Sequence, residues 1–114
     1  AAEHYRTALE RNPARAEIWV QYGHVLKQSG RRDQAESAYR RAIACEPTLA
    51  DSHLQLGHVL KQQGEQGEAG AAYLRAVARA PDCVDARVEL RRLGWRCVKG
   101  RGYKYWSTRY FQRR

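Results

Sequence analysis

The chain has 114 residues, of which 43% are hydrophobic and 29% charged, and it contains three cysteines. These values favour one small soluble domain. They argue against a disulfide framework or a zinc ribbon, because the cysteine number is odd and no Cys-x-x-Cys pair occurs. No apolar run approaches the roughly 18–20 residues needed to span a bilayer, and the first residues lack a secretory-signal pattern, so we expect a cytoplasmic protein.

The positive charge is concentrated at the C-terminal end. The formal net charge is +9, but residues 1–95 carry 14 basic and 12 acidic side chains, whereas residues 96–114 carry seven basic and none acidic. The charge therefore belongs to a tail, and it is weak evidence for a nucleic-acid-binding domain.

A period of 34 residues organises the first 95 residues. The segments 22–28 and 56–62 share six of seven residues. Three further series recur at the same spacing: Pro13, Pro47 and Pro81; Tyr5, Tyr39 and Tyr73; Ala8, Ala42 and Ala76. A fixed period of this length indicates stacked copies of one supersecondary unit.

Each unit is expected to hold two antiparallel helices. The first helix carries apolar residues at helical spacing and ends at a glycine in the left-handed conformation, Gly30 or Gly64. The second helix follows and is stopped by the proline. In chain order we expect a lone second helix over residues 1–12, first helices over 16–29 and 50–63, second helices over 33–44 and 67–80, and a capping helix over 82–95.

Small residues are expected where helices cross. Gly23 and Gly57 would cost about 1 kcal/mol in an ordinary helix, so we expect them to permit close helix approach. Cys45 lies at an apolar repeat position and is expected to be a small core residue.

The two ends of the array differ from its middle. The helix over residues 1–12 lacks a partner and should expose Tyr5, Ala8 and Leu9, which would permit self-association. The capping helix should have a polar outer side. Its candidate packing residues are Val84, Ala86, Val88, Leu90 and Leu93.

These positions carry a resemblance to a known family. Trp19, Tyr22, Gly23, Leu26, Ala35, Tyr39, Ala42 and Pro47 fit the tetratricopeptide pattern at every signature position. The second copy reads His53, Leu56, Gly57, Leu60, Ala69, Tyr73, Ala76 and Pro81, and only His53 departs, where tryptophan is usual. The resemblance divides residues 1–95 into a half repeat (1–13), two repeats (14–47 and 48–81) and a cap (82–95), followed by a tail (96–114).

The resemblance implies an all-α fold, a right-handed superhelix (α-solenoid) of helix pairs that acts as a scaffold for other proteins. First helices of this family line a concave surface that commonly holds peptides. The corresponding groove residues are Glu17, Val20, Gln21, His24, Lys27 and Gln28 in the first copy, Asp51, Leu54, Gln55, His58, Lys61 and Gln62 in the second, and Glu89 in the cap.

The recurring glutamine, histidine and lysine positions should form parallel polar ladders. Amides suit peptide backbones because each one both donates and accepts hydrogen bonds. The alternative is a duplicated but merely solvated face. His24 and His58 are expected to be neutral surface residues rather than metal ligands, and no metal or cofactor is expected.

Two subfamilies help to narrow the function. Co-chaperones of this family grip C-terminal carboxylates with a Lys/Asn/Arg clamp, whose positions here hold Val20, His24, Gln55, Asp85 and Glu89, so chaperone tails are not expected as ligands. The phrases Ile18-Trp-Val-Gln-Tyr-Gly-His24 and Leu93-Gly-Trp95 look like repeat regions that precede the sugar-transfer domain of bacterial glycosyltransferases. A substrate-docking or regulatory region of such an enzyme is therefore an alternative function.

The chain itself shows no catalytic motif, since Gly-x-Ser-x-Gly, phosphate-loop and His-Glu-x-x-His patterns are absent. We therefore expect a binding module rather than an enzyme. In the tail, basic residues alternate with Tyr103, Tyr105, Trp106, Tyr110 and Phe111. This mixture suits single-stranded nucleic acid or an anionic membrane surface, whereas packing on the array, or in the groove of a neighbouring copy, is the simpler alternative.

Overall fold

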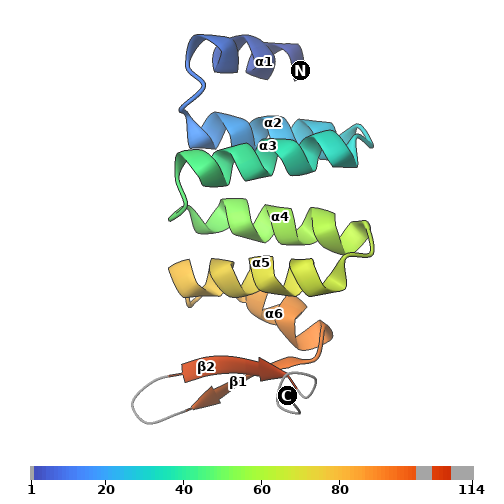
Figure 1. Cartoon of the computed structure of the whole chain (residues 1–114), viewed down its shortest axis with the longest axis vertical. Helices are drawn as coiled ribbons and strands as arrows, with labels where there is room; N and C mark the ends of the chain where they lie inside the picture. Colours follow the sequence, from blue (N-terminus) through green and yellow to red (C-terminus); the bar gives the residue numbers. More distant parts are fainter. Residues whose placement is uncertain (1, 100–103, 109–114) are drawn as a thin grey trace.

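The computed structural model describes residues 2–99 and 104–108, and in these it shows six helices stacked along one axis and a terminal β-hairpin (Figure 1). The helices are α1 (Ala2–Arg11), α2 (Ala16–Gln28), α3 (Arg32–Cys45), α4 (Ala50–Gln62), α5 (Gln66–Arg79) and α6 (Val84–Arg92), and the strands are β1 (Trp95–Lys99) and β2 (Lys104–Thr108). The first five helices begin and end within one residue of the expected bounds. The helical part is the all-α solenoid that the 34-residue period predicts.

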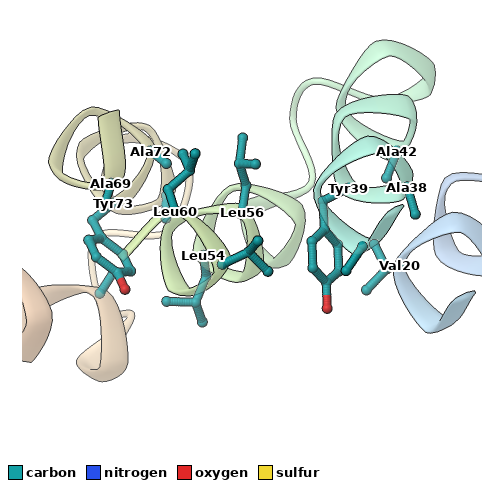
Figure 2. Close-up of a cluster of buried hydrophobic side chains, with 14 of the residues drawn as sticks. Val20, Ala38, Tyr39, Ala42, Leu54, Leu56, Leu60, Ala69, Ala72 and Tyr73 are labelled. Atoms are coloured by element: carbon teal, nitrogen blue, oxygen red, sulfur yellow. The ribbon is translucent and has the colours of Figure 1, made fainter. Parts of the chain in front are cut away.

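The core runs along the stack between successive helices. Tyr39 of α3 and Tyr73 of α5 are fully buried, and Leu54, Leu56 and Leu60 of α4 lie between them (Figure 2). Alanines on α3 and α5 are buried as well, which lets the second helices pack closely on their neighbours. Each repeat thus contributes one large aromatic ring to a continuous apolar core.

Each of these rings rests on a glycine of the preceding helix. A Cβ atom on Gly23 would lie 2.5 Å from Cε1 of Tyr39, and one on Gly57 would lie 2.6 Å from Cε1 of Tyr73. No side chain fits at such distances. The expectation that both glycines permit close helix approach is therefore confirmed.

The turn between the two helices of a repeat is the same in both copies. Gly30 and Gly64 have φ values of +80° and +83°, as expected for a left-handed helix end. The amide of Arg31 donates to the carbonyl of Leu26 at 2.9 Å, and the amide of Glu65 donates to that of Leu60 at 2.9 Å. These bonds satisfy the last carbonyls of α2 and α4 in a Schellman motif.

The histidine that departs from the family pattern keeps one part of the tryptophan's role. Nε1 of Trp19 donates to the carbonyl of Pro13 at 2.8 Å. Nε2 of His53 lies 2.8 Å from the carbonyl of Pro47. Because a carbonyl only accepts, Nε2 must carry the proton, and His53 ties the helix to the preceding turn as Trp19 does.

The other two central histidines are attached to the core tyrosines. Nδ1 of His24 lies 2.9 Å from the hydroxyl of Tyr39, and Nδ1 of His58 lies 2.8 Å from that of Tyr73. Both imidazoles are partly buried. His24 and His58 therefore do more than face the solvent, because each ring satisfies the hydroxyl of a tyrosine that has no exposed surface.

Three expectations about the burial of individual residues are wrong. Cys45 is exposed, because it lies at the last residue of α3, where the next repeat places the exposed Arg79. Val84 is 65% exposed, because it begins α6 at the end of a loop. Leu9 of α1 is buried rather than exposed, and Tyr5 and Ala8 are partly buried.

The C-terminal end differs most from expectation. The capping helix ends at Arg92, and Gly94, with a φ of +94°, turns the chain into β1. β1 pairs antiparallel with β2, from Trp95 opposite Thr108 to Lys99 opposite Lys104. A short hairpin was not expected because the tail shows no clear alternation of apolar and polar residues.

The hairpin is held to the array by its tryptophans. Trp95 and Trp106 are partly buried against the core, and Nε1 of Trp95 lies 3.1 Å from the position that a Cβ atom would take on Gly70. Packing on the array is thus what these two aromatic residues do. Tyr103, Tyr110 and Phe111 lie outside the described residues. Within the described part of the chain, no helix is both long and apolar enough to cross a membrane.

The glycine–tyrosine contacts predict a large cost for one added methyl group. We expect Gly57→Ala to lower the free energy of unfolding by about 1–3 kcal/mol, because the Tyr73 ring must move. Gly67→Ala is the matched control: a Cβ atom there meets nothing within 4 Å, so we expect about 0.5–1 kcal/mol of added stability from helix propensity. Urea unfolding followed by circular dichroism measures both. Equal midpoints for the two variants would contradict the packing.

Three histidines on the first helices predict a loss of stability in mild acid. Burial is the main cause that lowers the pKa of His24, His53 and His58 below the ordinary value of 6.5. As the pH falls through 6.5, the histidines of the unfolded chain take up protons before those of the folded chain do. The free energy of unfolding should therefore decrease until the pH reaches the lower pKa values of the folded chain. The urea midpoint should therefore be lower at about pH 5.5 than at about pH 7.5. His58→Gln should reduce this difference, and a midpoint independent of pH would refute the assignment.

Candidate functional site

The predicted groove residues come together on the first helices of the stack. α2 contacts α4 directly. Nζ of Lys27 donates to Oε1 of Gln55 at 3.3 Å, and Nζ of Lys61 lies 3.0 Å from Oε1 of Glu89. The same side-chain bridge therefore joins α2 to α4 and α4 to α6. We call the surface of Gln21, His24, Lys27, Gln28, Gln55, His58, Lys61, Gln62 and Glu89 the ladder face.

The core and the ladder face are joined by the tyrosines. The two hydroxyl groups point to the same side of the stack (Figure 2) and meet His24 and His58 there. The imidazole of each repeat is consequently held by the hydroxyl of a fully buried ring. A side chain that is already held in place loses less conformational entropy when a ligand binds.

Glu89 of α6 differs chemically from Gln21 and Gln55, which occupy the equivalent positions of the other two first helices. Glu89 is only 8% exposed and is held by Lys61 and, at 3.5 Å, by Arg92. Two cations compensate its charge, which a buried carboxylate requires. Glu89 therefore joins α4 to α6, and it is not available to receive a ligand in the way that an amide would be.

The two amides at equivalent positions also differ. Gln55 is partly buried, accepts from Lys27 and donates to Oδ1 of Asp51 at 3.3 Å. Gln21 is exposed, and its side chain forms no hydrogen bond with the rest of the chain as far as the structure describes it. Gln21 and the exposed Gln28 and Gln62 are thus the freer amides of the ladder face.

Two predicted groove residues lie inside the core. Val20 is 3% exposed and Leu54 is 6% exposed, so they support the ladder face from beneath. Glu17 and Asp51 are exposed at the beginning of their helices.

Charge is arranged in two parallel lines along the stack. Each first helix has an acidic residue in its first turn, namely Glu17, Asp51 and Asp85. Each has a basic residue in its last turn, and these are Lys27, Lys61 and Arg92. The arrangement stabilises every helix dipole. It also gives the ladder face one acidic edge and one basic edge.

The lysine bridges were not predicted, although the sequence holds a signal for them. Lys27 and Gln55 are 28 residues apart, and so are Lys61 and Glu89. A lysine repeated at fixed distance from an acceptor on the next first helix indicates a cross-helix contact. Among residues 2–99 and 104–108, no three His, Cys, Asp or Glu side chains are grouped so that they could hold a metal ion.

Several solved structures share this fold. The first TPR of Spaghetti (RPAP3), bound to the HSP90 peptide SRMEEVD, is 18% identical; the alignment covers 81% of this chain and 73% of that one, with a TM-score of 0.78. The OM64 TPR domain from Arabidopsis is 22% identical over 82% of this chain and 77% of that one, with a TM-score of 0.79.

A bacterial relative is more similar in sequence. TTC0263, a thermophilic TPR protein of Thermus thermophilus, is 31% identical over 82% of this chain, with a TM-score of 0.73. The alignment covers 47% of TTC0263, so this chain spans about half the length of that protein. Among curated protein sequences, none matches this chain.

One family description matches most of the chain. Residues 1–95, which hold all six helices of the described structure, match the cilia and flagella-associated protein 70 middle TPR-like domain. The match ends where β1 begins, so the helical array alone carries it. The chain therefore belongs to the tetratricopeptide-repeat family and, within it, to the family of that middle TPR-like domain.

Proposed function

We propose that this chain is a protein-interaction module whose ladder face binds an extended peptide segment of a partner protein. The observation that carries the proposal is the set of free amides, two of which, Gln21 and Gln28, lie together on α2, on a face where lysine bridges already pair other polar groups. Free amides can donate to and accept from a peptide backbone without first breaking a bond within the protein.

The charges on the face restrict which peptides fit. An acidic edge and a basic edge run along opposite ends of the first helices. A peptide that presents cations to one edge and anions to the other matches both, whereas a uniformly acidic peptide meets repulsion from Asp51 and Asp85. The solved domain bound to the peptide SRMEEVD supports peptide binding by this fold, but not the same peptide here.

The free amides provide the direct test. Peptides selected from a display library against the unmodified chain should bind the double variant Gln21→Ala, Gln28→Ala about tenfold more weakly, since two hydrogen bonds are lost. The matched control removes two exposed amides from the second helices, Gln34→Ala with Gln66→Ala, and should leave the affinity unchanged. Calorimetry measures all three. Equal loss in both double variants, or none in either, would place binding elsewhere.

The acidic positions predict a specific failure to bind. We expect the peptide SRMEEVD to have a dissociation constant weaker than about 1 mM, because the clamp positions hold Asp85 and the buried Glu89. A fluorescein-labelled peptide followed by anisotropy provides the measurement. Saturable binding well below that concentration would show that the acidic residues do not exclude chaperone tails.

A further inference from the structure

A second concave site lies between the two full repeats, and no residue of the ladder face lines it. The cleft has a volume of about 520 Å³. Its lining residues come from the second helices, from α4 and from the loop between α3 and α4: Arg40, Ile43, Ala44, Pro47, His53, Leu56, Arg75 and Arg79. We call it the arginine cleft.

His53 lines the cleft at the position where the first repeat has a tryptophan. In the first repeat, Trp19 occupies the position equivalent to His53, and the guanidinium of Arg41 lies 5.4 Å from the centre of its ring. In the second repeat, His53 makes the same carbonyl hydrogen bond, but an imidazole is smaller than an indole. Arg75, the equivalent of Arg41, donates through Nε to Nδ1 of His53 at 3.4 Å. The bond to the proline carbonyl is thus retained by a smaller ring, and the cation–π contact of the first repeat is replaced by a hydrogen bond.

The charge of the cleft is positive and largely uncompensated. Arg40 is paired with Glu36 at 2.8 Å and lies 3.8 Å from Glu68. Arg75 and Arg79 form no ion pair with a carboxylate in the part of the chain that the structure describes, and no carboxylate lines the cleft. His53 adds no charge while it accepts from Arg75. Two guanidinium groups are thus available to an anion at the rim.

The floor of the cleft is apolar. Ile43 is partly buried and Leu56 is fully buried, and Pro47 adds a third apolar wall. A hydrated inorganic ion would leave these groups unused. A ring or short alkyl group would lie over Leu56, cover the exposed surface of Ile43 and Pro47, and gain from the burial of that apolar surface.

We propose that the arginine cleft binds the phosphate monoester of a small organic molecule, with the phosphate at Arg75 and Arg79 and the organic group against Ile43 and Leu56. A phosphate monoester carries a charge of about −1.5 to −2 at neutral pH. It therefore matches the two guanidinium groups, which no carboxylate of the described chain pairs, better than a ligand with a single carboxylate would. The planar guanidinium fork also fits phosphate oxygens in pairs.

Simple probes test the two halves of the site. Phenyl phosphate should bind saturably in calorimetry, inorganic phosphate should bind about tenfold more weakly because it lacks the ring, and phenol should not bind measurably. Equal affinities of phenyl phosphate and inorganic phosphate, or no binding of phenyl phosphate, would overturn the proposal. A phosphotyrosine peptide that bound at least about tenfold more tightly than phenyl phosphate would assign the cleft to a protein ligand instead.

Variants locate the binding. His53→Trp should fill the cleft, raise the melting temperature and abolish phenyl phosphate binding, because Trp19 shows that the repeat accommodates an indole at this position. Arg75→Ala with Arg79→Ala, both exposed positions, should weaken binding about tenfold or more. Arg41→Ala, the equivalent of Arg75 in the first repeat, is the matched control and should bind normally. Undiminished binding by the folded Arg75→Ala, Arg79→Ala variant would refute the site.

The outcome is independent of the peptide proposal. The ladder variant Gln21→Ala, Gln28→Ala should bind phenyl phosphate like the unmodified chain, because neither glutamine lines the arginine cleft. Loss of phenyl phosphate binding in that variant would place the anion on the ladder face and overturn the assignment.

Discussion

The contact of a tyrosine ring with a bare glycine backbone determines most of this structure. Tyr39 on Gly23 and Tyr73 on Gly57 set the distance between the two helices of each repeat. With no Cβ atom in the way, the ring fills the space that would otherwise separate the helices. Its hydroxyl then emerges on the far side, where His24 or His58 satisfies it. One packing contact per repeat thereby connects the core with the polar surface.

The two repeats are similar in sequence but differ in the surfaces they present, because their neighbours differ. Lys27 reaches an amide, whereas Lys61 reaches the buried carboxylate of Glu89. The α4–α6 half of the ladder face therefore contains an ion pair, whereas Gln21 and Gln28 of α2 are free amides. Elsewhere on the stack, the first repeat has the larger Trp19 at the position where His53 lines the arginine cleft in the second. A duplicated unit can in this way form two different surfaces.

The sequence was a good guide wherever a repeated position had one physical task. The period located five helices to within one residue, and Gly30 and Gly64 have the left-handed conformation expected of them. It was a poor guide at the ends, where no second copy exists for comparison. The capping helix is shorter than expected and a hairpin follows it. Cys45 was assigned to the core, although the exposed Arg79 at the equivalent position indicates the opposite.

The sequence alone determined the repeat, the helix order and the residue types on each first helix, because these depend on local periodicity and on glycine and proline conformation. Tertiary structure decided which of the polar residues remain free. Gln21 and Gln55 occupy equivalent positions, yet only Gln55 has Lys27 and Asp51 beside it. The contact with Lys27 depends on how α2 and α4 stack, whereas Asp51 lies on the same helix as Gln55. Such contacts between side chains 28 residues apart are fixed only when the helices pack.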